Sequence, residues 1–321
     1  CMPQLTAKKY QLTFIAGVTM KVDDINFKFF HINKWDNGEF KGDAISTTSE
    51  LVKISSDGNL GLEEGQKFER GGIYRFTVDV TKGNTKAVLT VEKVGKVDLP
   101  APDIFFGNDK MEVTDTDIYK SDQAFTQGQM ITVTGIDNLN EWWIDPDFFE
   151  KQSDGALKFL PINGDYRVTA NAVLKYFSVM ALKDGKPAKL QDDGTGAIWA
   201  IGKGIGKPSV TSSEVGWEPS KALCLAQVAS KKYQLTLKAG ETLKTSGDPE
   251  VISFKFFHQN DWGGEFVNYA SSILVEQLKL ADSGNLEMQD NKAFEEGAVY
   301  RFTIDVTNGN ANADLKGEKI N

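Results

Sequence analysis

The sequence predicts an all-β protein built of tandem immunoglobulin-like β-sandwiches. Three observations predict it: a long internal repeat, apolar residues that alternate with polar ones along short runs, and 30 glycines, many of them in turns between these runs. The 321 residues are enough for two or three domains. A hydrophobic content of 40% and a charged content of 25% are typical of globular proteins, which excludes wholesale disorder, collagen and coiled coil.

A strong repeat relates the two ends of the chain. The segment Lys8–Thr13 recurs as Lys231–Thr236, and Phe27–His31 recurs as Phe254–His258, with further matches in the same order downstream. A fainter third copy lies between them, around residues 154–169. A repeat of this length indicates tandem modules. We therefore predict three sandwiches, at residues 1–96, 97–190 and 191–321.

Each module shows the period of two that is typical of half-buried strands. In the first module Tyr10, Leu12 and Phe14 share one face of a predicted strand, and the segment 74–81 alternates in the same way. Turn sequences rich in Asp, Gly and Asn separate these runs. We place the joints between modules near residues 98–102, which contain two prolines, and near the Gly/Asp-rich residues 192–196.

The first module is shorter than the third at its N-terminal side. Cys1 aligns with Cys224, yet the third module carries additional strand-like sequence before that cysteine, at residues 197–202 and 216–223. We expect the first module to lack its N-terminal part. The alternative is a reduced module with an open sheet edge, which would favour pairing with another chain.

Composition excludes several classes of partner. With 36 basic and 45 acidic residues the formal net charge is −9, which disfavours nucleic acid as a partner. Two cysteines and two histidines are too few for a disulfide framework or a Cys/His metal cluster. No apolar run approaches the ~18 residues of a membrane helix. We expect no cofactor and no metal; calcium at the Asp/Gly/Asn turns is the alternative left open.

No catalytic constellation emerges, and we predict that the protein is not an enzyme. His31 and His258 are equivalent in the repeat, so a triad would have to exist twice; we expect both to pack at strand ends. The acid pair of Asp145-Pro146-Asp147 is expected to form an ordinary turn. The glycine-rich residues 202–208 match no nucleotide-binding motif, and we expect a loop that opens no helix.

Tryptophans beside polar, turn-like sequence are the remaining candidates for a binding site. A flat indole suits the apolar C–H face of a sugar ring, and neighbouring polar groups suit its hydroxyls. The alternative is that these rings plug the ends of sandwich cores, because tryptophan is highly buried on average. The candidate carbohydrate-binding residues are Trp35, Trp142, Trp143, Trp217, Trp262, Asn260, Asp261 and Tyr269.

Four segments of the third module, in their order, carry a resemblance to a known group. These are Ile198–Gly202, Gly216–Leu223, Tyr233–Gly240 and Phe254–Phe257, the last with a tryptophan and a glycine downstream. The sequence resembles the SusE/SusF group of Bacteroidetes outer-membrane starch-binding lipoproteins. The resemblance covers the third module well, the first through the repeat, and the middle one weakly.

The resemblance implies a non-catalytic cell-surface protein made of carbohydrate-binding-module-like β-sandwiches. It further implies an N-terminal lipid anchor in the outer membrane, a TonB-dependent glycan importer as partner, and Trp217 as a residue that stacks on sugar. The insertion at residues 203–215 departs from the group, so the type of glycan stays open, as do the number of sites and the oligomeric state. The alternatives are a structural or adhesive β-sandwich protein and, third, a glycoside hydrolase.

Overall fold

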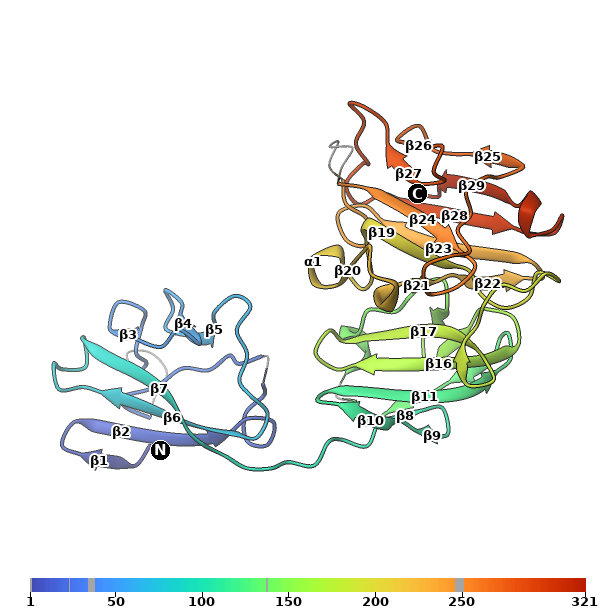
Figure 1. Ribbon diagram of the computed structural model, residues 1–321. Coiled ribbons are helices and arrows are strands. Elements are labelled where there is room, and N and C mark those ends of the chain that lie inside the picture. The colour runs from blue at the N-terminus through green and yellow to red at the C-terminus, as the bar shows by residue number, and fades with distance from the viewer. Residues whose placement is uncertain (1, 23, 34–37, 137, 246–250) are drawn as a thin grey trace. The chain divides into compact units, whose positions relative to one another are not determined.

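The computed structural model describes residues 2–22, 24–33, 38–136, 138–245 and 251–321. Strands dominate these residues, and their only α-helix is a single turn, α1 (Val210–Ser213). The predicted all-β class with several β-sheet domains is confirmed. The chain divides into two compact units, unit 1 (Cys1–Pro100) and unit 2 (Ala101–Asn321), and each is described by itself (Figure 1).

Unit 1 contains a five-stranded sheet in the order β1-β2-β6-β7-β3 and a separate hairpin, β4-β5. Residues along β6 alternate between buried and half-buried, as the period-two pattern predicts. Its own core includes Phe68, Tyr74 and Phe76. The strands are β1 (Gln4–Thr6), β2 (Lys9–Ile15), β3 (Ile45–Thr47), β4 (Val52–Ile54), β5 (Leu60–Leu62), β6 (Gly72–Asp79) and β7 (Ala87–Lys96).

The middle module forms the first part of unit 2. Its largest sheet has the order β10-β11-β16-β17-β18, and two three-stranded sheets, β12-β15-β14 and β13-β8-β9, complete it. The elements are β8 (Phe105–Phe106), β9 (Asp109–Lys110), β10 (Glu112–Asp115), β11 (Ile118–Phe125), β12 (Met130–Ile131), β13 (Val133–Thr134), η1 (Leu139–Glu141), β14 (Phe149–Lys151), β15 (Leu157–Phe159), β16 (Gly164–Asn171), β17 (Tyr176–Lys183) and β18 (Lys186–Pro187).

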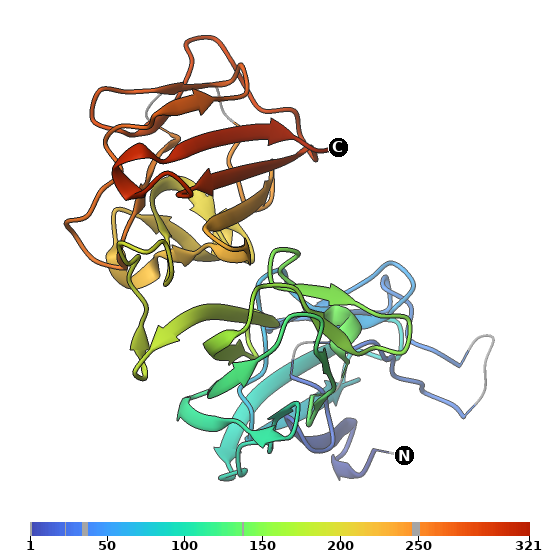
Figure 2. The same cartoon turned by 90° about the vertical axis from the view of Figure 1, so that its right-hand side faces the viewer.

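The third module has two larger sheets, β20-β19-β24-β27-β26 with β21 beside β19, and β22-β23-β28-β29-β25. Figure 2 shows the two red C-terminal strands, β28 and β29, side by side. Besides α1, the elements of this module are β19 (Trp199–Gly206), β20 (Glu214–Gly216), η2 (Pro219–Lys221), β21 (Leu223–Cys224), β22 (Ala226–Ala229), β23 (Lys232–Lys238), β24 (Ser253–Phe257), β25 (Ser271–Ile273), β26 (Leu278–Leu280), β27 (Leu286–Met288), β28 (Val299–Asp305), η3 (Asn310–Asn312) and β29 (Asp314–Lys319).

The sequence repeat is also a repeat of topology. The order β1-β2-β6-β7-β3 in unit 1 corresponds to β22-β23-β28-β29-β25 in the third module, and in both sheets the last strand pairs parallel to its neighbour. A cross-strand ion pair recurs as well: Lys9 Nζ lies 3.1 Å from Asp79 and Lys232 Nζ lies 3.1 Å from Asp305. Repeated residues therefore occupy equivalent places in two similar sheets.

The middle and third modules share one continuous core. Buried side chains from Ile104 to Leu315 belong to a single cluster. Backbone bonds cross between the modules: the Ile162 amide donates to the Gln227 carbonyl, and the Leu190 amide donates to the His258 carbonyl, each at 2.8 Å. The predicted joint at residues 192–196 thus lies inside a compact unit, whereas the joint at residues 98–102 coincides with the division between units.

The prediction of a loop at residues 202–208 was wrong. Residues 202–206 belong to β19, and the single-turn helix α1 follows, capped by the Ser209 side chain, which accepts from the Ser212 amide. The close packing of neighbouring backbones explains why glycines occupy this strand. A Cβ on Gly202 would lie 2.3 Å from Phe254 Cα, and one on Gly206 would lie 2.3 Å from the Ser213 carbonyl oxygen. Only glycine lets the backbones approach this closely.

Candidate functional site

Two of the predicted tryptophans meet at one end of the third module. Trp217 lies between β20 and η2, and Trp262 lies in the loop after β24. Their ring centroids are 6.3 Å apart and the ring planes are within 26° of parallel. The Trp262 side chain is 51% exposed, while Trp217 is half-buried. We call this pair, which combines an exposed indole with a partly sheltered one, the tryptophan pair.

The loop that carries Trp262 is held in place by its own polar side chains. Gln259 Nε2 donates to the Trp262 carbonyl at 2.6 Å, and the Trp262 amide donates to Asp261 Oδ1 at 2.8 Å. Gly263 and Gly264 both have a positive φ, of 85° and 73°, which lets the chain turn back tightly. The edge of Phe257 supports the Trp262 ring at 6.1 Å. The exposed indole is therefore positioned before any ligand arrives.

Polar residues follow or precede both tryptophans closely in the sequence. Asn260 is half-buried, Asp261 is exposed, and Glu218 next to Trp217 forms an exposed ion pair with Lys221 at 3.0 Å. The structure thus brings Trp217, Trp262, Asn260 and Asp261 into two adjoining loops. Two loops that carry both aromatic rings and hydrogen-bonding side chains are suited to a ligand with both characters.

Tyr269 packs into the module. Its ring stacks on Phe266 with centroids 5.8 Å apart and planes within 8°. Its hydroxyl is buried without a hydrogen-bond partner among the described residues, and burial raises the pKa of the phenol. Tyr269 therefore supports the loop through Phe266, and it presents little ring surface to a ligand.

The two tryptophans of the middle module have structural contacts. Trp142 is only 8% exposed and stacks on Phe177, with centroids 4.4 Å apart. Its ring is covered, so it is unavailable as a binding surface. Trp143 is half-buried, packs edge-on against Tyr176, and donates its indole N–H to Glu241 of the third module. Trp35 lies outside the described residues.

A buried ionic cluster joins the middle and third modules. The Lys207 ammonium donates to Asp145 Oδ1 and Oδ2 at 2.8 and 2.7 Å and to Asp147 Oδ2 at 3.0 Å. All three residues are at most 5% exposed. Asp147 also accepts from Gln234 Nε2 at 2.7 Å and from the Thr236 amide and hydroxyl at 2.6 Å each. We call these three charged residues the buried triad.

The environment of the buried triad shifts its pKa values in different directions. Burial raises the pKa of Asp145, which the neighbouring Lys207 only partly offsets. Burial also acts to raise the pKa of Asp147, but Lys207 and the hydrogen bonds from Gln234 and Thr236 outweigh it and hold that pKa below its ordinary value. Both carboxylates are buried, and each accepts a hydrogen bond from the Lys207 ammonium.

The sequence analysis did not predict the buried triad, because the local sequence around Lys207 gives only a weak sign of burial. Lysine is almost never fully buried unless it is paired, and its partners lie in another module. The one available signal was a lysine inside a run of glycines and apolar residues, followed by a proline, where an exposed loop would offer more polar residues.

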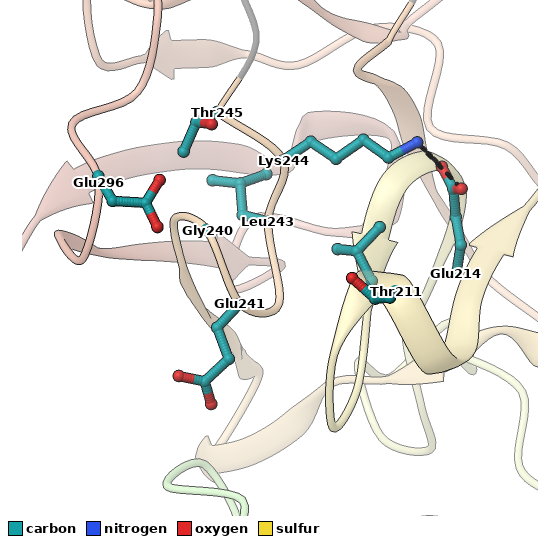
Figure 3. Close-up of a pocket in the computed structure, with 9 residues that line it drawn as sticks. Thr211, Glu214, Gly240, Glu241, Leu243, Lys244, Thr245 and Glu296 are labelled. Carbon is teal, nitrogen blue, oxygen red and sulfur yellow. Dashed lines mark hydrogen bonds and ion pairs between the residues drawn. The ribbon is translucent and has the colours of Figure 1, made fainter. Parts of the chain in front are cut away.

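The pocket in Figure 3 has a volume of about 520 Å³ and lies in the third module. Its charged residues are Glu214, Glu241, Glu296 and Lys244. Lys244 Nζ reaches Glu214 at 2.9 Å, as the dashed line in Figure 3 shows, and Glu241 pairs with Lys238 at 2.8 Å. Within the pocket Lys244 and Glu214 therefore pair with each other, while Glu241 is held from outside it by Lys238 and Trp143. The described residues contain no group of three or more His, Cys, Asp or Glu that could hold a metal.

Two further findings concern histidine and the membrane. His258 packs edge-on against Phe266, with centroids 4.2 Å apart, and burial lowers its pKa. His31 packs edge-on against Phe40.

Among the described residues, no helix has the length and apolar character needed to cross a membrane.

Comparison with known proteins places the chain in a family. A family model described as a domain of unknown function, DUF5121, matches residues 1–81 and 193–307. A second one, also described as a domain of unknown function, DUF5125, matches residues 97–190. No curated protein matches the chain. The chain belongs to the DUF5121 family, and it carries a DUF5125 domain between the two matched segments.

Proposed function

We propose that the protein is a non-catalytic glycan-binding protein that captures polysaccharide or oligosaccharide at the cell surface. The observation that carries this proposal is the tryptophan pair, with Trp262 51% exposed although its loop is held firmly in place. An exposed indole held in a fixed position, with a second ring beside it, offers a flat apolar face to a ligand.

The geometry of the tryptophan pair supports a sugar in particular. Sugar rings present an apolar C–H face that stacks on indole, together with hydroxyls that need hydrogen bonds. Trp217 and Trp262 offer two nearly parallel rings 6.3 Å apart, and Asn260, Asp261 and Glu218 offer amide and carboxylate groups in the same loops. Neighbouring residues of a glycan chain would contact the two rings in turn.

The cellular setting of the proposal rests on the resemblance to SusE/SusF-type lipoproteins. On that basis the protein is held to the outer membrane by a lipid and delivers glycan to a TonB-dependent importer. The repeat gives the first module a tryptophan at the position of Trp262, namely Trp35. Two weak sites on one chain would bind a repeating polysaccharide with increased avidity.

Affinity electrophoresis against a panel of polysaccharides tests the proposal. The wild-type protein is expected to be retarded by at least one gel, and Trp262→Ala or Trp217→Ala should weaken retardation by about tenfold or more if the pair is the centre of the site. Phe105→Ala is the matched control, because Phe105 is an exposed aromatic residue, 36% exposed, in the middle module. Unaltered mobility of the folded wild-type protein in every gel would contradict the proposal.

A structural or adhesive spacer is the second candidate. The buried triad and the shared core favour it, because they fix the middle and third modules into one rigid body. A spacer would show no retardation and no effect of the tryptophan substitutions. Release of reducing sugar from any polysaccharide of the panel would instead favour the third candidate, a glycoside hydrolase.

A further inference from the structure

A cleft of about 670 Å³ lies inside unit 2, between the middle and third modules. One wall is a face of the middle module's large sheet, where Thr169 on β16 pairs with Ser178 on β17. The other wall consists of the single-turn helix α1 and of residues 220–224, which include β21. A volume of this size is within the usual range for a small-molecule site. We call this hollow the module cleft.

The insertion at residues 203–215 builds part of the module cleft. It carries the end of β19, the whole of α1 and the start of β20. All four residues of α1 line the cleft, and the Ser209 side chain fixes the start of the helix by accepting from the Ser212 amide. The segment that departs from the SusE/SusF pattern therefore forms a wall opposite the middle module.

The charged residues that line the module cleft are all paired within the protein. Two of the four, Asp145 and Lys207, belong to the buried triad and are bonded to each other. Glu214 pairs with Lys244 at 2.9 Å, and Lys221 pairs with Glu218 at 3.0 Å. Binding of an ion depends on a complementary charge in the site. The pairing therefore favours a neutral ligand.

Uncharged polar groups and apolar side chains share the lining of the module cleft. The polar ones include Thr169, Asn171 and Ser178 from the middle module and Thr211, Ser213 and Ser220 from the third. Leu174 and Leu223 provide apolar surface. A few polar groups within a partly apolar lining are typical of sites that orient a small ligand. Hydroxyl and amide groups suit a ligand that is itself rich in hydroxyls.

Tyr176 adds a hydroxyl that the protein itself does not use. The residue lines the module cleft and is 7% exposed. Its hydroxyl forms no hydrogen bond with a described residue, yet it is not one of the fully enclosed hydroxyls without a partner, which are those of Tyr269 and Tyr300. The Tyr176 oxygen is therefore open to the cleft. Burial and the carboxylates of the buried triad raise the pKa of this phenol, so it stays protonated and can donate.

We propose that the module cleft is a second binding site, which takes a neutral saccharide of one or two sugar units. The Tyr176 hydroxyl donates to a sugar oxygen, since buried polar groups in proteins are almost always hydrogen-bonded. The hydroxyls of Ser178 and of α1 bond to sugar hydroxyls, and the apolar lining faces sugar C–H groups. This site is separate from the tryptophan pair and does not depend on it.

Titration calorimetry of the full chain with neutral saccharides tests the proposal. The panel is glucose, galactose, mannose, maltose, cellobiose and lactose. We expect at least one to bind in the module cleft and to slow hydrogen exchange of the amides in residues 210–213 and 220–224. Trp262→Ala should retain one binding event per chain, because Trp262 does not line the cleft. Loss of all binding in Trp262→Ala would assign it to the tryptophan pair and overturn the proposal.

A matched pair of hydroxyl deletions locates the site. Tyr176→Phe should weaken binding by about fivefold and leave the free energy of unfolding unchanged, because this hydroxyl bonds to no described residue. Tyr300→Phe is the control: it removes a buried hydroxyl without a partner on β28, outside the cleft, and should bind as wild type. Ser178→Ala is a second deletion in the cleft and should also weaken binding by about fivefold.

Three results of these measurements would overturn the proposal. The first is that no saccharide of the panel binds to the folded wild-type chain. The second is that Tyr176→Phe and Ser178→Ala both bind as tightly as wild type. The third is that Tyr176→Phe lowers the free energy of unfolding more than Tyr300→Phe does, which would show that the Tyr176 hydroxyl is bonded within the protein.

Discussion

The Lys207 ammonium lies 2.7 Å from Asp145 Oδ2 in the interior of unit 2, although different family models match the two residues. Both side chains are at most 3% exposed. A buried ion pair costs much desolvation to form, so its net contribution to stability is small. Removing one partner is different, because it leaves the remaining charge buried and unpaired.

Replacing Lys207 should therefore destabilise unit 2. We expect Lys207→Met to lower the free energy of unfolding by about 3–5 kcal/mol, since it leaves Asp145 and Asp147 without a counter-charge. Urea denaturation followed by fluorescence measures the loss. Lys203→Met is the control, because Lys203 lies on β19, the strand that ends one residue before Lys207, but is exposed. Equal free energies of unfolding for the two variants would show that unit 2 does not depend on the buried triad for its stability.

Quenching of tryptophan fluorescence should identify Trp262 as an indole open to solvent. Iodide reaches exposed rings, and among the described tryptophans Trp262 is 51% exposed whereas Trp199 is 1% exposed. Trp262→Phe should lower the quenchable fraction of the emission, and Trp199→Phe should not. Trp35, outside the described residues, contributes equally to both variants. A larger loss of quenchable emission in Trp199→Phe than in Trp262→Phe would contradict the exposed position of Trp262.

Alkaline pH should destabilise unit 2 through Cys224. Burial raises the pKa of this thiol from its ordinary 9.0 to about 12. Below pH 9 the thiol is protonated in both states. Above it the unfolded chain releases the proton and the folded chain retains it, so the free energy of unfolding falls as pH rises, by about 1 kcal/mol per pH unit. Cys224→Ala should show a shallower fall in urea titrations over this range; identical slopes would contradict the assignment.

Substitutions of two glycines in the third module should lower the free energy of unfolding by different amounts. Gly202 and Gly216 both have a positive φ, of 143° and 59°, so a side chain strains the backbone at either position. Around Gly216 no atom lies within 4 Å of a new Cβ, so Gly216→Ala should cost only about 1–2 kcal/mol. Gly202→Ala also drives its Cβ into Phe254 and should cost more. Thermal unfolding of both variants makes the comparison, and a smaller cost at Gly202 would contradict it.

Much of the fold could be predicted from the sequence, because it depends on local patterns. The alternation of Tyr74, Phe76 and Val78 with polar residues predicts β6, and the repeat extends that prediction to β28. Trp217 and Trp262 were both candidates, but their stacking depends on how two loops meet in the folded module. The distance between their rings therefore cannot be predicted from a local sequence pattern.

The burial of Trp142 and Lys207 could not be predicted, for a different reason. Each is buried by residues far away in the sequence: Phe177 covers Trp142, and Asp145 and Asp147 enclose Lys207. The glycines of β19 also misled the prediction, because glycine usually lowers the tendency to form a strand. Here they allow close contact with β24 and with the backbone near α1.

The repeated Phe-Lys-Phe-Phe-His segment also bears on how the two copies diverge over evolutionary time. Phe257 is 1% exposed and Phe30 is 36% exposed, so a smaller residue at position 257 opens a cavity, while the same change at position 30 removes less contact. Mutations that purifying selection removes from one copy are thus tolerated in the other. Related sequences should therefore vary sooner at the position of Phe30 than at the position of Phe257.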